Sequence, residues 1–188
     1  MSPFQEKISA AVSKKEALFD ESLGRYALRS MYAGAYLTMS TAVGIIGADV
    51  IASQFPSLSR FVFTFIFAIG LVFVLIFGGE LATSNMMYLT TGTYYKQITW
   101  KKVTQMLLYC TFFNFVGATI LAWLFNQSFS YLNLSDKSFV VNAVTIKLGK
   151  SDWSNFIEGL GIITAVCVTL AIAGWLALLH FKIRVEGL

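Results

Sequence analysis

The residues best able to do chemistry lie in one short polar run inside a long apolar stretch. The run GGELATSN at 78–85 follows the most apolar segment of the chain and precedes MMYLTTG at 86–92. It holds a glycine pair, the carboxylate of Glu80, and hydroxyl and amide side chains where a lipid-facing helix would carry leucines. Non-helical backbone survives at membrane depth only beside protein or water, because unpaired backbone groups in hydrocarbon are costly. We interpret the run as a helix break that lines a transport pathway.

The simpler interpretation is that 78–85 is the exposed end of a span. Against this, a helix over 61–77 would be about 25 Å long at 1.5 Å per residue, slightly short of the hydrocarbon core. The chain would then need residues 86–92 to finish crossing the membrane. This length argument favours a break within the membrane.

Glu80 and a pair of apolar side chains are the candidates near this break. A carboxylate inside a membrane usually faces a cavity or a partner. Glu80 could relay protons or accept hydrogen bonds from the N–H groups of the broken turn, and we favour the structural role. Phe67 and Leu71 lie one helical turn apart and share a face, which could form a hydrophobic constriction. Plain packing is the alternative in a segment so rich in Phe.

Signatures of catalysis are not found. His180 is the single histidine and follows the last apolar run, so we expect it at the interface. Cys110 and Cys167 stand alone in apolar runs, without metal-ligand spacing. The sequence shows no Ser/His/Asp set and no glycine-rich phosphate loop. We therefore expect a protein that is not an enzyme and that binds no cofactor or metal.

The composition is that of a membrane protein. Of 188 residues, 56% are hydrophobic and 13% are charged, whereas soluble domains carry about 25% charged residues. Several stretches reach the roughly 20 apolar residues that a spanning helix needs. The sequence thus predicts an all-α, polytopic membrane helix bundle. The predicted elements form a single membrane domain over 1–188: an amphipathic helix at 1–24, then spans at about 27–53, 60–94 (broken at 78–85), 103–126, 137–149 and 157–181.

Three of these elements invite further interpretation. The span at 27–53 is rich in small residues, which let helix backbones approach closely in lipid, so we expect it to be central. The span at 137–149 is the weakest, because it is short and only moderately apolar. In the first helix Phe4, Ile8 and Val12 recur every fourth residue. Such a helix can lie in the membrane interface or can be a plain surface helix, and the sequence leaves both open.

Basic residues gather at alternate edges of the apolar segments. They lie before the first span and in the loop at 96–102, whereas the loops on the other side hold only Arg60 and Lys137. The positive-inside rule then places the N-terminus in the cytoplasm of a plasma-membrane protein. The net charge of +4 forms no basic stripe on a polar domain, so nucleic acid is not expected as a partner. The expected partner is the lipid bilayer.

Longer segments resemble a known family. These segments are GGELATSNMMYLTTG with the preceding FAIGLVFVLIF, the N-terminal EALFDESLGRYALRSMYAGAYLTM, and WKKVTQMLLYCTFFNFVGATILAWLF. Together they resemble the formate/nitrite transporter family over roughly residues 10–160. The resemblance implies homopentamers in which each protomer has its own pore for a small monovalent anion. It also implies an aquaporin-like protomer of two inverted halves, each with a broken helix.

The resemblance also assigns roles to residues. By position, Leu81 and Thr83 match the break residues that line the central constriction, and Phe67 and Leu71 match apolar gates. Lys147 precedes Gly159 with the spacing of a family lysine thought to favour anions. With Glu80, these residues form the predicted pore pathway.

The C-terminal part departs from the family pattern. Ile163 stands where the family has an asparagine, and Ala82 stands where many members carry a bulky aromatic residue. The second broken helix with its pore histidine, and the sixth span, are not recognisable. The sequence therefore predicts a member whose C-terminal third is lost or altered.

The predicted function is a membrane channel or transporter for small monovalent anions such as formate, nitrite or similar weak acids. Apolar constrictions resist a bare anion because stripping its water is expensive. Two alternatives stay open: a membrane scaffold subunit without transport, and a neutral-solute channel of the aquaporin type. The latter normally shows paired Asn-Pro-Ala turns, and neither Pro3 nor Pro56 lies in one.

Overall fold

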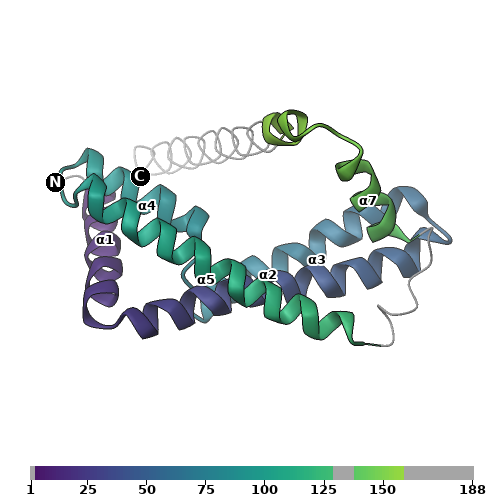
Figure 1. Cartoon of the computed structure of the whole chain (residues 1–188), viewed down its shortest axis with the longest axis horizontal. Coiled ribbons are helices and arrows are strands. Elements are labelled where there is room, and N and C mark those ends of the chain that lie inside the picture. The colour runs from purple at the N-terminus through teal and green to yellow at the C-terminus, as the bar shows by residue number, and fades with distance from the viewer. Residues whose placement is uncertain (1–2, 129–137, 159–188) are drawn as a thin grey trace, which may run out of the picture. The chain divides into compact units, whose positions relative to one another are not determined.

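The computed structural model describes residues 3–128 and 138–158, and these residues form helices joined by short turns, with no strand among them. This confirms the predicted all-α class. Three helices are long and apolar enough to cross a membrane: α2 (Leu23–Ala52), α3 (Pro56–Ile76) and α5 (Trp100–Asn126). The predicted span at 157–181 lies almost wholly outside the described residues. Figure 1 shows the order of the helices.

The chain divides into two compact units, Met1–Phe139 and Val140–Leu188. The first unit contains α1 (Pro3–Glu21), α2, α3, α4 (Ala82–Tyr94) and α5. Helix α7 (Phe139–Leu148) begins at the boundary. Its 10 residues would reach about 15 Å, half of the hydrocarbon core. The single membrane domain stays a prediction.

Helix α1 is part of the packed core of the first unit. Its apolar residues Ile8, Val12 and Leu18 are buried in one cluster with Leu89 of α4 and Val103 of α5. Protein therefore covers Ile8 and Val12, two of the three residues in the stripe that was predicted to be able to face the lipid interface. The side chain of Phe4 is outside the described set. After α1 the chain turns at once, where the hydroxyl of Ser22 caps α2 by accepting from the N–H of Arg25 at 3.2 Å.

Helix α3 begins earlier than the sequence pattern predicts. Pro56 occupies its first turn, a position that suits proline because no intrahelical N–H bond is needed there. The 21 residues of α3 are about 31 Å long at 1.5 Å per residue, enough to span a membrane. The length of α3 therefore does not show whether residues 86–92 are needed to complete the crossing, and the depth of the break is judged from α5 instead.

The break is also shorter than predicted. Helix α3 ends at Ile76 and α4 begins at Ala82, so the non-helical residues are 77–81 rather than 78–85. Residues 82–85 instead form the first turn of α4, and the N–H of Asn85 donates to the carbonyl of Leu81 at 2.9 Å.

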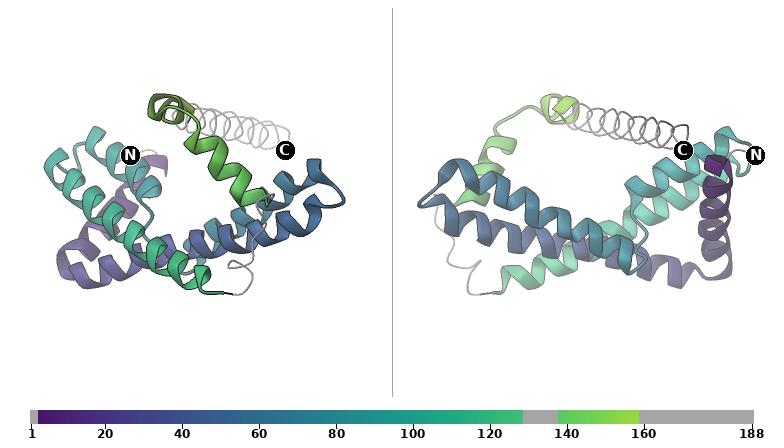
Figure 2. Two further views of the ribbon diagram at one scale, coloured as in Figure 1. Left: turned by 45° about the vertical axis from the view of Figure 1, so that its right-hand side comes forward. Right: turned by 180° about the vertical axis from the view of Figure 1, so that it is seen from behind.

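Helices α2 and α5 cross near their middles, as Figures 1 and 2 show. Glycines permit the close approach: a Cβ on Gly34 would overlap the carbonyl of Asn114, and one on Gly117 would overlap the carbonyl of Met31. Helix α3 packs on α2 beyond this crossing, where Gly70 lies against Ser40. Helix α2 thus contacts α1, α3 and α5, which confirms the central place predicted from its small residues.

Candidate functional site

The break begins with a glycine turn that ends α3. Gly78 has φ +66°, a left-handed conformation that glycine adopts without steric cost. The N–H of Gly79 then donates to the carbonyl of Val74 at 2.8 Å, which is the bond of a Schellman motif. The carbonyls of Phe73 and Val74 near the end of α3 are thereby satisfied.

The next backbone groups are paired with other helices. The N–H of Glu80 donates to the carbonyl of Arg29 in α2 at 3.1 Å. The carbonyl of Glu80 accepts from Nδ2 of Asn114 at 2.8 Å and from Sγ of Cys110 at 3.2 Å. The N–H of Ala82, at the start of α4, donates to Oδ1 of Asn114 at 2.9 Å. Protein from α2 and α5 therefore surrounds the break, as non-helical backbone within a membrane requires.

Asn114 is the centre of this arrangement. Besides bonding both sides of the break, its Nδ2 donates to the carbonyl of Ser30 in α2 at 2.7 Å. An asparagine amide has two N–H donors and one carbonyl oxygen, and here both ends of the amide are in use. Asn114 is not among the site residues predicted from the sequence. The signal available was an amide in the middle of an otherwise apolar helix.

The carboxylate of Glu80 pairs with a lysine of α1. Lys15 Nζ lies 2.6 Å from Oε2, and the two side chains are only 13% and 9% exposed. The same ammonium group lies 5.7 Å from the ring centroid of Tyr88 in α4. The partner of Glu80 is thus a lysine ammonium and not, as we favoured, the N–H groups of the broken turn, and the choice between a structural role and a proton relay stays open. In the sequence, Lys15 is one of the basic residues that precede the first predicted span, and its pairing with Glu80 was not predicted.

A buried polar network continues from the break into the first unit. Asn85 Nδ2 donates to the hydroxyl of Tyr26 at 2.9 Å and to Sγ of Cys110 at 3.4 Å. The hydroxyl of Ser30 contacts Cys110 Sγ at 3.5 Å. Tyr26, Ser30, Asn85 and Cys110 are all fully buried. The network is not fully satisfied, because Oδ1 of Asn85 is buried without a hydrogen-bond partner among the described residues.

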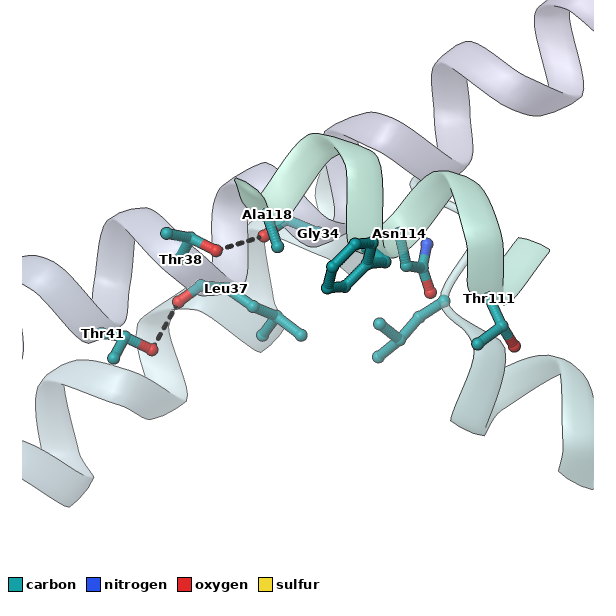
Figure 3. A pocket seen from close by; sticks show the side chains of 9 residues that line it. Gly34, Leu37, Thr38, Thr41, Thr111, Asn114 and Ala118 are labelled. Carbon is teal, nitrogen blue, oxygen red and sulfur yellow. Dashed lines mark hydrogen bonds between the residues drawn. The ribbon is translucent and has the colours of Figure 1, made fainter. Parts of the chain in front are cut away.

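A groove of about 350 Å³ opens beside the break, between α2 and α5 (Figure 3). Two of its hydroxyls bond to their own helix: Thr38 donates to the carbonyl of Gly34 at 3.0 Å, and Thr41 to that of Leu37 at 2.7 Å. With these protons committed, the two threonine oxygens offer the groove acceptor lone pairs. The lining residues are Gly34, Leu37, Thr38, Thr41, Leu81, Thr111, Asn114, Phe115 and Ala118.

The predicted pathway residues fall in different places. Leu81 lines the groove. Thr83 is exposed and is not among the lining residues. Phe67 is half-buried and stacks on Phe63, with ring centroids 6.2 Å apart, and Leu71 is 41% exposed. The structure does not bring Phe67 and Leu71 to the groove, and their role as gates stays a prediction.

The remaining predicted residues belong to the second unit or lie beyond the described part. Lys147 is in α7, and its side chain is outside the described set. His180 and Ile163 also fall outside it. Among the described residues, no group of three His, Cys, Asp or Glu side chains could hold a metal ion.

Comparison with known proteins gives a consistent result. The family model described as "Formate/nitrite transporter" matches residues 3–182, a wider range than the resemblance at 10–160. The chain is 31% identical over 147 residues to a formate channel, BtFdhC, of Bacillus thuringiensis. It is 26% identical over 171 residues to an uncharacterised transporter, YwcJ, of Bacillus subtilis. It is 30% identical over 103 residues to a probable formate transporter of Methanothermobacter thermautotrophicus.

These alignments cover 77%, 89% and 54% of this chain. They cover 54%, 65% and 38% of the relatives, so the chain spans less than two thirds of the length of each. The family match nevertheless extends over almost all of the chain, including the break and both helices that hold it. This chain belongs to the formate/nitrite transporter family.

Proposed function

We propose that the protein moves small monovalent weak acids, such as formate or nitrite, across the plasma membrane as a homopentamer. The observation that carries the proposal is the break at 77–81 beside the middle of α5. Asn114, which holds the break, lies about 21 Å from the start of α5 and about 18 Å from its end at 1.5 Å per residue. A break at this depth, with a groove beside it, suits a transport pathway better than a surface turn.

The chemistry of the groove favours the protonated acid over the bare anion. A carboxylate or nitrite ion needs hydrogen-bond donors. Thr38 and Thr41 have committed their protons to backbone carbonyls, which leaves Thr111 as the lining threonine whose hydroxyl can donate. A neutral acid carries an O–H that can donate to the free lone pairs of these oxygens. The apolar side chains of Leu37, Leu81 and Phe115 oppose desolvated charge in the same space. For Lys147, in the second unit, we propose the role that the family resemblance implies, which is to favour the anion by its positive charge.

The proposal is tested by uptake of labelled formate and nitrite into proteoliposomes. Ala118→Trp should fill the groove and reduce uptake at least about tenfold, because a tryptophan brings much more volume than alanine into a space of about 350 Å³. The matched control is Leu75→Trp on α3, where the side chain is 79% exposed and uptake should be unchanged. A correctly inserted protein without uptake would instead favour the scaffold alternative.

Thr83 and the gate pair need separate variants, because they lie off the groove. Thr83→Val removes a hydroxyl with little change of volume. Reduced uptake with normal insertion would extend the pathway to that face of α4, and unchanged uptake would restrict it to the side of Leu81. Phe67→Ala and Leu71→Ala test the constriction in the same assay. If these two side chains form a gate, the variants should take up larger acids than the wild-type protein does.

Orientation is tested by labelling single cysteines from outside the cell. A cytoplasmic N-terminus places the loop after α4 inside and the turn before α3 outside. Tyr94→Cys and Phe55→Cys are suitable because the native side chains are 81% and 59% exposed. An impermeant maleimide should label position 55 and miss position 94. The reverse pattern would overturn the orientation.

A further inference from the structure

We infer that Asn114 is a positioning residue of the pathway. It holds Leu81 in place at the edge of the groove and so limits the size of the acids that the groove accepts. The inference rests on the proposed function, since an aperture matters only if a solute passes it. It adds a residue in α5 that touches the groove and both sides of the break.

Asn114 joins three segments of the first unit. Its amide bonds the carbonyl of Ser30 in α2, the carbonyl of Glu80 in the break, and the N–H of Ala82 at the start of α4, at 2.7, 2.8 and 2.9 Å. Leu81 is the residue between the last two contacts. Both peptide groups around Leu81 are therefore tied to one side chain of α5.

The position of Asn114 is itself fixed by the contact between α2 and α5. Its backbone carbonyl lies against Gly34, where any Cβ would overlap it, so α5 cannot shift toward α2. The next turn is locked in the same way by Gly117 against Met31. Since Asn114 and Leu81 both line the groove, the amide transmits this rigid crossing to the lip of the groove.

The other contacts of the break could replace those of Asn114 only in part. The carbonyl of Glu80 would keep Cys110 Sγ at 3.2 Å, a weak donor, and its N–H would keep Arg29. The N–H of Ala82, by contrast, donates to Asn114 alone among the described residues and would be left open. Without the amide, the Leu81–Ala82 end of the break should therefore loosen more than the Gly79–Glu80 end.

The experiment uses Asn114→Leu, which removes the amide at similar volume, and Asn114→Asp, which keeps an acceptor for Ala82 but loses the donor pair. The control is Asn126→Leu, the same change at the exposed end of α5. Uptake of formate and of the larger acetate is measured in proteoliposomes. We expect the formate-to-acetate ratio to fall at least about fivefold in Asn114→Leu, less in Asn114→Asp, and not in Asn126→Leu, in line with the loss of part-buried hydrogen bonds.

Amide hydrogen exchange tests the anchor without transport. In Asn114→Leu, exchange in a peptide covering 78–85 should become at least about tenfold faster while a peptide covering 103–109 stays unchanged. An unchanged size ratio, or exchange that rises equally in both peptides, would overturn the inference. If Asn114→Leu fails to insert, Asn114→Asp decides by the same two measurements. Wild-type protein with no uptake would refute the proposed function, whereas the exchange result would still decide whether Asn114 holds the break.

Discussion

The two helices that flank the break differ in how they are held. Helix α3 has 21 residues, and only Ser59, Gly70 and Val74 among them are buried. Helix α4 has 13 residues, of which Asn85, Leu89 and Gly92 are buried, against α1 and α5. Lipid satisfies the apolar surface of α3 as well as protein would. The α4 side is held by an ion pair, amide bonds and a packed core.

This difference indicates which side of the break is the fixed one. Glu80 and Asn85 find their partners in α1, α2 and α5, and α3 supplies only the Schellman turn. We therefore expect the stability of the first unit to depend on α4 and its partners. Substitutions on the outer face of α3 should be nearly silent.

The largest expected effect is at the Lys15–Glu80 pair. Glu80→Gln or Lys15→Met alone leaves one charge buried without its partner and should cost about 3–5 kcal/mol of stability. The double variant removes both charges and should recover most of the loss. Denaturant unfolding in mixed micelles measures this.

The control for that prediction is the pair of Lys102 with Asp20, whose side chains are 25% and 53% exposed. Asp20→Asn should cost less than about 1 kcal/mol, because partly exposed pairs contribute little. If removing one partner cost the same unfolding free energy in both pairs, the conclusion that the Lys15–Glu80 pair holds the α4 side of the break would be contradicted.

A cavity comparison should give the next largest effect. Leu89 in α4 is 0% exposed and Leu75 in α3 is 79% exposed. Leu89→Ala should cost about 2–5 kcal/mol by leaving a cavity in the core. Leu75→Ala leaves no cavity and should change stability by less than about 0.5 kcal/mol. Similar losses measured by the same unfolding assay would show that α3 packs as tightly as α4.

A smaller effect is expected at Gly70, where α3 packs tightly on α2. This position is therefore an exception to the low burial of α3. A Cβ there would meet the side chain of Ser40 and lie 3.0 Å from the carbonyl of Tyr36. Gly70→Ala should therefore cost about 1–3 kcal/mol by overpacking. A Cβ on Gly24 in α2 would meet none of the described residues within 4 Å, so Gly24→Ala should be neutral or slightly stabilising through helix propensity. A neutral Gly70→Ala in the same unfolding assay would mean that α3 is held even more loosely than its burial suggests.

The sequence by itself determined the class of the protein, the three long apolar helices α2, α3 and α5, and the approximate place of the break. Hydropathy sums over neighbouring residues, so apolar runs and the glycine pair at 78–79 can be recognised without knowing what lies beside them. The family followed from the same segments, because GGELATSNMMYLTTG is both local and specific. The length of α3 was misjudged because SQFPSLSR resembled a turn, whereas Pro56 starts the helix.

Only the tertiary structure decided the partners at the break. Lys15 meets Glu80 across 65 residues of sequence, and Asn114 meets Ala82 across 32. Which side chains meet depends on how each helix is rotated about its axis, about 100° per residue, and on where α2 and α5 cross. The close contacts at Gly34 and Gly117 fix the crossing of α2 and α5. The periodicity of one helix cannot reveal them, so Leu81 and Thr83 looked equivalent in the sequence although only Leu81 reaches the groove.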